Sequence, residues 1–122
     1  MAVKIYGPVN LDRRGGTVAF NVLDGKGRAI PYWIVEAVAR EAGVAVRGGC
    51  FCNPGASEKA FGFRADDARR CAEKISANEF TVARFAECLG PTVPVGAVRA
   101  SIGMAANLED VDRLIEVVDS FS

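Results

Sequence analysis

A short glycine-bounded segment of the sequence carries two cysteines that could act as sulfur nucleophiles. Cys50 and Cys52 stand one residue apart, after Arg47 and two glycines and before an Asn-Pro-Gly turn at 53–55. A cysteine attacks as its thiolate, and it needs exposure and a nearby positive charge that favours the ionised form. The position of Arg47 therefore predicts a surface loop suited to sulfur chemistry.

The same two cysteines allow two other interpretations. They could be small, half-buried apolar side chains in a tight turn. They could also bind a metal, but structural zinc takes four ligands, usually as wider-spaced cysteine pairs or cysteines with histidine. The chain contains no histidine, and Cys71 and Cys88 are far away in the sequence. We expect no metal site, no disulfide scaffold, and packing of Cys71 and Cys88 as apolar side chains of helices.

Arg99 is the second residue whose position suggests chemistry. It lies inside a predicted strand between Val98 and Ala100, and side chains alternate across a strand, so Arg99 projects to the face opposite these neighbours. A guanidinium group there can bind a carboxylate through two parallel hydrogen bonds. A solvated arginine on an exposed sheet face is the simpler alternative. None of the lysines has the setting typical of a Schiff-base lysine.

Short strands and amphipathic helices are the elements that would position these residues. Apolar alternation and turn residues predict strands over 3–6, 16–23, 44–47 and 97–102. The strand at 3–6 is expected at a sheet edge, because Pro8 cannot continue a ladder. Helical spacing and caps predict helices over 31–42, 65–75, 80–89 and 107–121, with 56–63 ambiguous.

Two of the predicted helices have apolar stripes that should face the core. The first stripe comprises Ile34, Val35, Val38 and Ala42. The last helix, with Asn107 and Asp110 as a variant capping box, has the stripe Leu108, Val111, Leu114, Ile115, Val118 and Phe121. So few strands among these helices predict a two-layer α+β sandwich, with a small, mostly antiparallel sheet of about four strands and helices packed on one face.

Length and charge limit the classes of protein to consider. The 122 residues form one domain, and Lys+Arg balances Asp+Glu at 15 each. This balance argues against a nucleic-acid partner, which requires a basic excess. The sequence has no apolar run of about 18 residues and no long apolar start typical of a secretory signal. We therefore expect a cytoplasmic chain without a membrane partner.

The cysteine loop and two of the predicted strands resemble those of a known family. The loop Arg47-Gly48-Gly49-Cys50-Phe51-Cys52-Asn53-Pro54-Gly55-Ala56 is similar to the Arg-Thr-Gly-Cys-Phe-Cys-Asn-Pro-Gly-Ala loop of molybdenum cofactor sulfurases and related class V aminotransferase-fold proteins. It also resembles the Arg-Thr-Gly-His-His-Cys loop of cysteine desulfurases. The segments 16–23 and 96–114 resemble a strand and the closing strand and capped helix of the same domain, so the resemblance covers most of the chain.

The resemblance implies the C-terminal small domain of an enzyme that depends on pyridoxal phosphate (PLP). Cys52 matches the desulfurase nucleophile that accepts sulfur as a persulfide, and Cys50 occupies a histidine position of that loop. Arg99 matches the arginine that binds the substrate carboxylate, and Arg47 opens the loop near the pocket mouth. Gly48 departs from the family by replacing a threonine.

The resemblance also implies partners that this chain does not contain. The large domain that holds PLP is absent, so the chain alone is expected to bind no cofactor and to be inactive without that domain. Relatives are dimers, which makes a homodimer a further expectation. The alternative is an independent sulfur-carrier or binding module that kept the fold. In either case the cysteine loop and Arg99 are expected to form one wall of an incomplete pocket.

Overall fold

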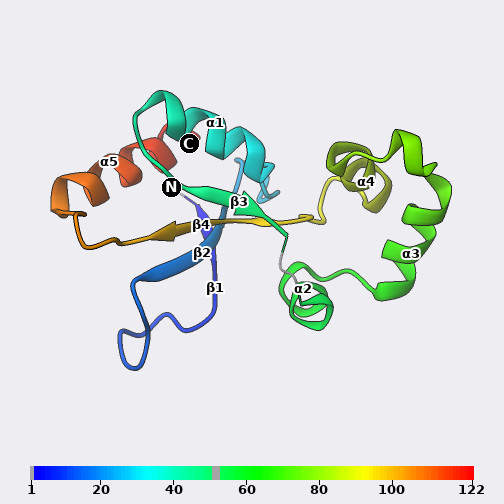
Figure 1. Ribbon diagram of the computed structural model, residues 1–122, viewed down its shortest axis with the longest axis horizontal. Helices are drawn as coiled ribbons and strands as arrows, with labels where there is room; N and C mark the ends of the chain where they lie inside the picture. Colours follow the sequence, from blue (N-terminus) through cyan, green and yellow to red (C-terminus); the bar gives the residue numbers. More distant parts are fainter. Residues whose placement is uncertain (1, 51–52) are drawn as a thin grey trace.

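Four strands are interspersed with helices along the chain in the computed structural model, which describes residues 2–50 and 53–122 (Figure 1). The strands are β1 (Val3–Tyr6), β2 (Thr17–Val22), β3 (Arg47–Gly49) and β4 (Ala97–Ser101). The helices are α1 (Tyr32–Glu41), α2 (Pro54–Phe61), α3 (Ala65–Lys74), α4 (Val82–Leu89) and α5 (Leu108–Asp119), with a short 3-10 helix η1 (Ala77–Glu79).

The four strands form one antiparallel sheet in the order β1-β2-β4-β3. This confirms the predicted α+β class and the position of β1 at an edge. The last strand in the sequence lies between β2 and β3, so it places segments about fifty residues apart side by side. The short strand β3 forms the other edge.

Helices α1 and α5 cover one face of the sheet (Figure 1). The core between the two layers is built from Phe20, Val22, Val35, Val98 and Val118. The alternation of Phe20 and Val22 in β2 places both side chains on this covered face, as predicted. The opposite face carries Arg47 and Arg99 and is not covered by these two helices.

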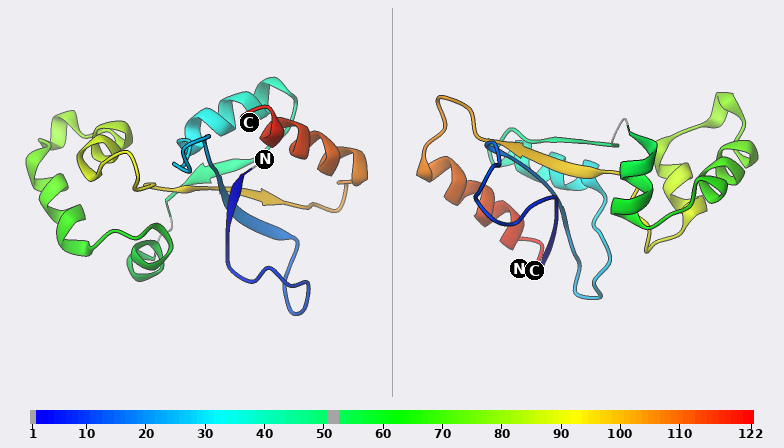
Figure 2. Two further views of the ribbon diagram at one scale, coloured as in Figure 1. Left: turned by 180° about the vertical axis from the view of Figure 1, so that it is seen from behind. Right: turned by 90° about the horizontal axis from the view of Figure 1, so that it is seen from below.

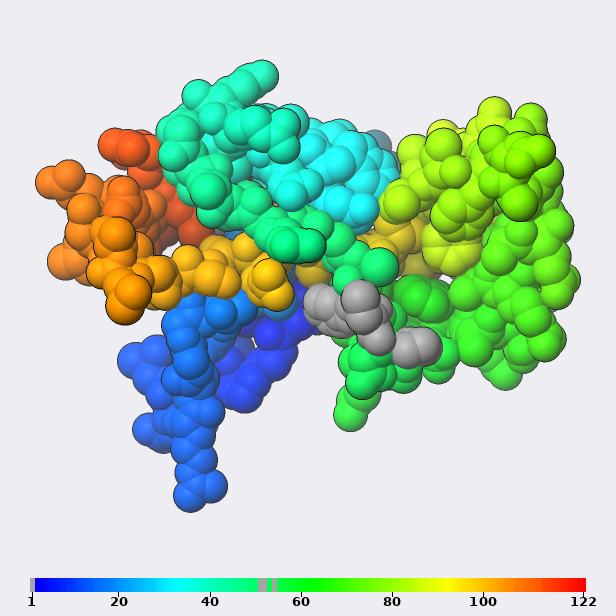
Figure 3. Space-filling view, in the orientation of Figure 1, coloured from blue at the N-terminus to red at the C-terminus, as the bar shows by residue number. Residues whose placement is uncertain are grey.

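Helices α2, α3 and α4 form a separate group, here called the helical lobe (residues 54–89). The lobe lies to one side of the sheet, beyond the ends of β3 and β4 (Figures 1 and 3). Helices α3 and α4 pack mainly against each other. The sequence indicated helices in this region, but it did not indicate that they would leave the layer formed by α1 and α5.

The lobe contains a disulfide, so the prediction that Cys71 and Cys88 only pack as apolar side chains is wrong. Cys71 of α3 and Cys88 of α4 are bonded to each other, 17 positions apart in the sequence. Cys71 is buried, as expected, whereas Cys88 is exposed. Two helices joined by a short turn brought the cysteines together, and helical periodicity in one sequence does not reveal such a pairing.

Two boundaries differ from the predicted ones for local reasons. The strand expected at 44–47 begins only at Arg47, because the amide of Val44 still donates to the Ala39 carbonyl at 2.8 Å and extends the end of α1. The Asn-Pro-Gly turn starts a helix instead of closing the loop. Asn53 caps α2 by accepting from the amide of Ala56 at 3.1 Å.

The two predicted apolar stripes are only partly buried. In α1 the buried residues are Val35 and Ala39, whereas Ile34 is exposed. In α5 the capping box of Asn107 and Asp110 is confirmed, but Leu108 is 81% exposed. The start of α5 extends beyond the end of β4 (Figure 1), and the residues of its first turn are exposed.

The two ends of the chain lie close together beside α5 (Figure 2). Both ends lie over the sheet body and away from the helical lobe (Figure 2). Among the helices of the described part of the chain, none has the length and apolar character needed to cross a bilayer.

Candidate functional site

The register of β3 against β4 brings three of the predicted site residues to one hollow. Arg47 lies directly opposite Arg99, and Gly49 lies opposite Ala97. Cys50 follows β3 immediately. These residues border a hollow of about 570 Å³ whose floor is formed by the two strands and by Ala19 of β2.

The two arginines form an unusual pair across the strands. Like charges directly opposite each other in an antiparallel ladder destabilise it unless something neutralises them. Both residues are exposed, and neither makes an ion pair or a side-chain hydrogen bond with any part of the chain that the structure describes. Two exposed guanidinium groups at opposite positions of neighbouring strands, with no ion-pair partner among the described residues, are suited to binding an anion such as a carboxylate.

The structure describes one of the two loop cysteines. Cys50 is exposed and is a free thiol. Cys52, the predicted nucleophile, lies outside the described residues, so its prediction stays untested. The roles assigned to Cys50, Arg47 and Arg99 also remain predictions, although these three residues do surround the same hollow.

Two residues of α1 hold β3 from the covered side of the sheet. The Gly48 amide donates to Oε1 of Glu36 at 2.8 Å in a partly buried position. The Tyr32 ring lies directly against Gly48, so closely that a Cβ atom at this position would collide with the ring. This packing gives a physical reason for glycine where the resembling loops have threonine.

Burial raises the pKa of Tyr32, and the nearby Cys50 thiol and Glu36 carboxyl raise the pKa further. The phenol is therefore neutral over the physiological range. A neutral ring can pack against the glycine backbone without the cost of burying a charge.

Asn21 links β2 to the start of β4. Its side chain is buried, and its Nδ2 donates to the Tyr6 hydroxyl at 3.0 Å and to the Gly96 carbonyl at 3.1 Å. Its Oδ1 atom has no hydrogen-bond partner among the residues described. The bond to Gly96 fixes the backbone three residues before Arg99.

Sequence reasoning missed Tyr32, Glu36 and Asn21. Asn21 gave a weak signal, since it is a polar residue in the middle of an otherwise apolar strand. Tyr32 and Glu36 gave none, because a tyrosine and a glutamate in the first turns of an amphipathic helix are ordinary residues. Only the crossing of α1 over β3 gives them a role.

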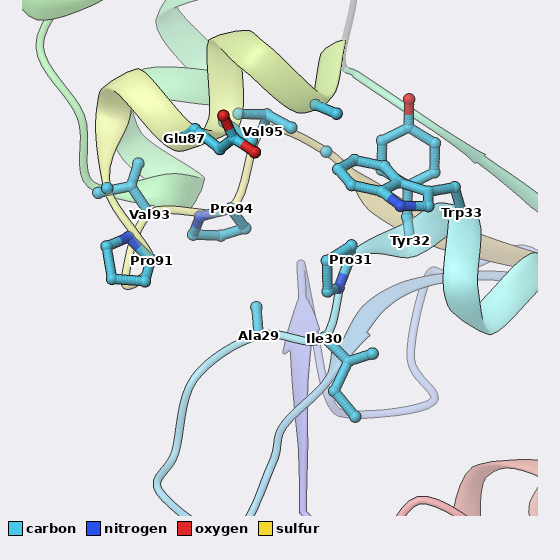
Figure 4. Close-up of a pocket in the computed structure, with 14 residues that line it drawn as sticks. Ala29, Ile30, Pro31, Tyr32, Trp33, Glu87, Pro91, Val93, Pro94 and Val95 are labelled. Carbon is cyan, nitrogen blue, oxygen red and sulfur yellow. The ribbon is translucent and has the colours of Figure 1, made fainter.

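A second hollow of about 430 Å³ lies between the start of α1 and α4 (Figure 4). Its lining is mostly apolar and includes Pro31, Trp33, Pro94 and Val95, with the carboxylate of Glu87 on one side. No residue predicted to take part in chemistry lines it.

Neither a metal nor PLP has a complete set of partners at the arginine hollow. The described residues contain no group of three His, Cys, Asp or Glu side chains placed to hold a metal ion. The residues around the hollow include no lysine that could hold PLP covalently. Lys4 instead donates to the Ala60 carbonyl at 3.2 Å. The residues present therefore do not fit PLP by themselves.

Comparison with known proteins gives a consistent set of relatives. The chain is 36% identical over 120 residues to molybdenum cofactor sulfurase 2 of Culex quinquefasciatus. It is also 36% identical over 124 residues to molybdenum cofactor sulfurase of Drosophila melanogaster. Its homologues are molybdenum cofactor sulfurases. These alignments cover 96% and 97% of this chain.

The chain spans only about 15% of the length of these two sulfurases. The sulfurase of Anopheles gambiae gives the same result, with 36% identity over 105 residues, or 86% of this chain and 13% of the relative. No protein-family model matches the chain, and no solved structure matches it significantly. The homology therefore concerns one segment of much longer sulfurases.

Proposed function

We propose that this chain is the thiol- and arginine-bearing segment of a PLP-dependent sulfurase, of the cysteine desulfurase type. In this proposal a loop cysteine, Cys52 or Cys50, accepts sulfur, and Arg99 with Arg47 binds the carboxylate of the sulfur donor. The observation that carries the proposal is the pairing of Arg47 with Arg99 beside Cys50 at one open hollow. Homology to molybdenum cofactor sulfurases supports it.

The step assigned to this chain is the transfer of one sulfur atom to the loop. The loop thiolate attacks the outer sulfur of a persulfide donor and forms a new sulfur–sulfur bond. The donor's own sulfur–sulfur bond breaks, and the donor leaves as a thiolate. The outer sulfur keeps its proton, and the step needs no external oxidant or reductant.

The arginine pair supplies binding and orientation in this step. Hydrogen bonds between a guanidinium group and a carboxylate are short and directional, so they fix both the position and the rotation of the donor. A donor held this way presents its sulfur toward the side of the hollow where Cys50 lies. The two positive charges also lower the cost of holding the reacting thiolate.

PLP would supply the electron withdrawal that releases sulfur from an amino acid. Because the residues around the hollow do not fit PLP, we propose that the groups holding it belong to a large domain, in the same polypeptide or in a separate one. The open face of the sheet beside Arg47 and Arg99 is where that domain would complete the pocket. A homodimer is compatible with this arrangement.

The experiment compares two persulfide donors on the purified chain, one with a carboxylate and one with an amide in its place. Mass spectrometry of the loop peptide follows persulfide formation at Cys50 and Cys52. We expect faster loading by the carboxylate donor. Arg99→Ala should reduce that preference about tenfold, the value of one charge-assisted hydrogen bond pair.

Two controls make this result specific. Arg64, exposed before α3, provides a matched variant, and Arg64→Ala should leave the preference for the carboxylate donor unchanged. Arg99→Lys should restore only part of it, because a point charge replaces a planar fork. Equal loading by both donors in the unmodified chain would contradict the proposed arginine role.

The second candidate function is an independent sulfur carrier without PLP chemistry. The exposure of Cys50 favours it, because a carrier must offer its thiol to other proteins. A carrier would pass the loaded sulfur on to an acceptor thiol with no large domain present, whereas the first proposal requires that domain for sulfur release from an amino acid.

A further inference from the structure

Helix α1 and strand β3 meet through two side chains that have no part in the proposed chemistry. Oε1 of Glu36 accepts the Gly48 amide at 2.8 Å. Gly48 is the middle residue of a three-residue edge strand, so this bond ties the strand to the helix. An edge strand this short has few ladder bonds of its own.

The Tyr32 ring fills the space between the end of β3 and the start of β4. Cβ atoms placed on Gly48 or on Gly96 would collide with this ring, at Gly96 with a separation of 2.8 Å from Cδ1. The same atom on Gly96 would approach the Gly49 carbonyl oxygen to 2.6 Å. Absence of side chains at Gly48 and Gly96 therefore lets ring and backbone pack closely.

Trp33 supports the Tyr32 ring from the neighbouring groove. The two rings meet edge to face, with centroids 5.1 Å apart (Figure 4). Such contacts favour a fixed ring orientation. Tyr32 thus contacts both Trp33 and the glycine backbone of β3.

We infer that Tyr32 and Glu36 are positioning residues that set where the cysteine loop leaves the sheet. Glu36 fixes the backbone at Gly48, two residues before Cys50. The Tyr32 ring fixes the separation of this backbone from β4. Together they hold Cys50 at the hollow bordered by Arg47 and Arg99. The inference rests on the proposed function only in taking this loop as the reactive one.

The first test measures hydrogen exchange of the Gly48 amide by NMR in the full chain. Glu36→Ala removes the acceptor and should increase exchange about tenfold, the effect of losing one partly buried hydrogen bond. Glu36→Gln keeps an acceptor oxygen and should restore protection. Glu41→Ala, an exposed glutamate on the same helix, is the matched control and should change nothing.

Unchanged Gly48 protection in Glu36→Ala would overturn the inference for Glu36. This readout involves no sulfur chemistry, so it separates failure of the inference from failure of the proposed function. A variant that merely loosens the whole fold would also lose protection in β2, whereas we expect β2 to keep it.

The second test is a double-mutant cycle between Tyr32 and Gly48. While Tyr32 is present, Gly48→Ala should destabilise the fold and raise the equilibrium constant of unfolding about tenfold, because the new methyl group collides with the ring. In a Tyr32→Ala background the same change should cost much less, since the ring is gone and only Oε2 of Glu36, at 3.1 Å, stays close to the new methyl group. Gly103, whose Cβ would meet nothing within 4 Å, provides the control variant Gly103→Ala.

An equal cost of Gly48→Ala in both backgrounds would overturn the inference for Tyr32. The functional readout is persulfide loading of the loop. We expect loading to slow in Glu36→Ala and to recover in Glu36→Gln. Recovery with an uncharged side chain would show that the hydrogen bond, and not the negative charge, positions the loop. Equal loading in Glu36→Ala and the unmodified chain would contradict a positioning role.

Discussion

Two tyrosines are placed where ionisation would be costly. Burial raises the pKa of Tyr6, although the hydrogen bond from Asn21 acts in the opposite direction. Burial also raises the pKa of Tyr32, with added effects of Cys50 and Glu36. They are the chain's only tyrosines. Each phenol therefore stays neutral in the folded chain at a pH where the unfolded chain has begun to ionise.

This difference predicts a loss of stability in alkaline solution. A group whose pKa is raised by folding contributes fully below its unfolded value, and its contribution falls as the pH rises from the ordinary tyrosine value of 10.0. The free energy of unfolding should fall above that pH, and less steeply in Tyr32→Phe. Denaturant titrations at several pH values measure it.

Ultraviolet titration gives an independent check on Tyr32. Tyr6→Phe leaves Tyr32 as the chain's single tyrosine, so the absorbance change of the phenolate reports this residue alone. We expect its midpoint above that of the denatured chain. Titration at the denatured value would contradict the burial of Tyr32 against β3.

At the scale of elements, the helix pair α3 and α4 depends on a cross-link more than on a core. Cys71 is the buried side chain of α3, and α4, described along its whole length, has none. Ring contacts such as that between Phe80 and Phe85 add to the lobe, but Phe80 is exposed. The sheet body, in contrast, has a shared core between its two layers.

Reducing the disulfide should therefore loosen the lobe and leave the sheet body folded. A cross-link closing a loop of this size contributes about 3 kcal/mol by restricting the unfolded chain. We expect faster amide exchange in α3 and α4 after reduction by a dithiol or in Cys88→Ser, with β2 and β4 unchanged.

Cys50→Ser is the matched control for that experiment, because it removes a free thiol and keeps the cross-link. It should leave exchange in the lobe unchanged. Loss of protection throughout the sheet body on reduction would mean that the lobe and the body unfold as one unit.

At the scale of the whole molecule, the arginine hollow is open on the side away from α1 and α5. The chain spans about 15% of the length of the sulfurases it resembles. The hollow offers two cations and a thiol but no lysine. These features are those expected of one wall of a pocket whose other wall lies elsewhere.

The chain by itself should therefore not release sulfur from free cysteine. With PLP added, we expect no absorbance band of a bound coenzyme and no alanine formed, while loading from a persulfide donor proceeds. Absorbance spectra and amino-acid analysis measure both. Formation of alanine by the purified chain alone would contradict the proposed division of labour.

Much of the fold could be predicted from the sequence because its signals are local. Alternation in β2 and β4, the glycine after α1 and the capping box at Asn107 each act within a few residues. The charged neighbours of the loop cysteines are local as well. These signals were enough to indicate the α+β class and to identify Cys52, Cys50, Arg99 and Arg47 as candidate site residues.

The tertiary structure decided what depends on distant segments meeting. The sequence determined that Arg47 and Arg99 each lie in or beside a strand, but only the pairing of β3 with β4 placed them opposite each other. The bond between Cys71 and Cys88, the exposure of Leu108 and the contact of Tyr32 with Gly48 likewise follow from packing. Strand pairing and helix crossing join residues far apart in the chain, and local periodicity carries no information about which ones meet.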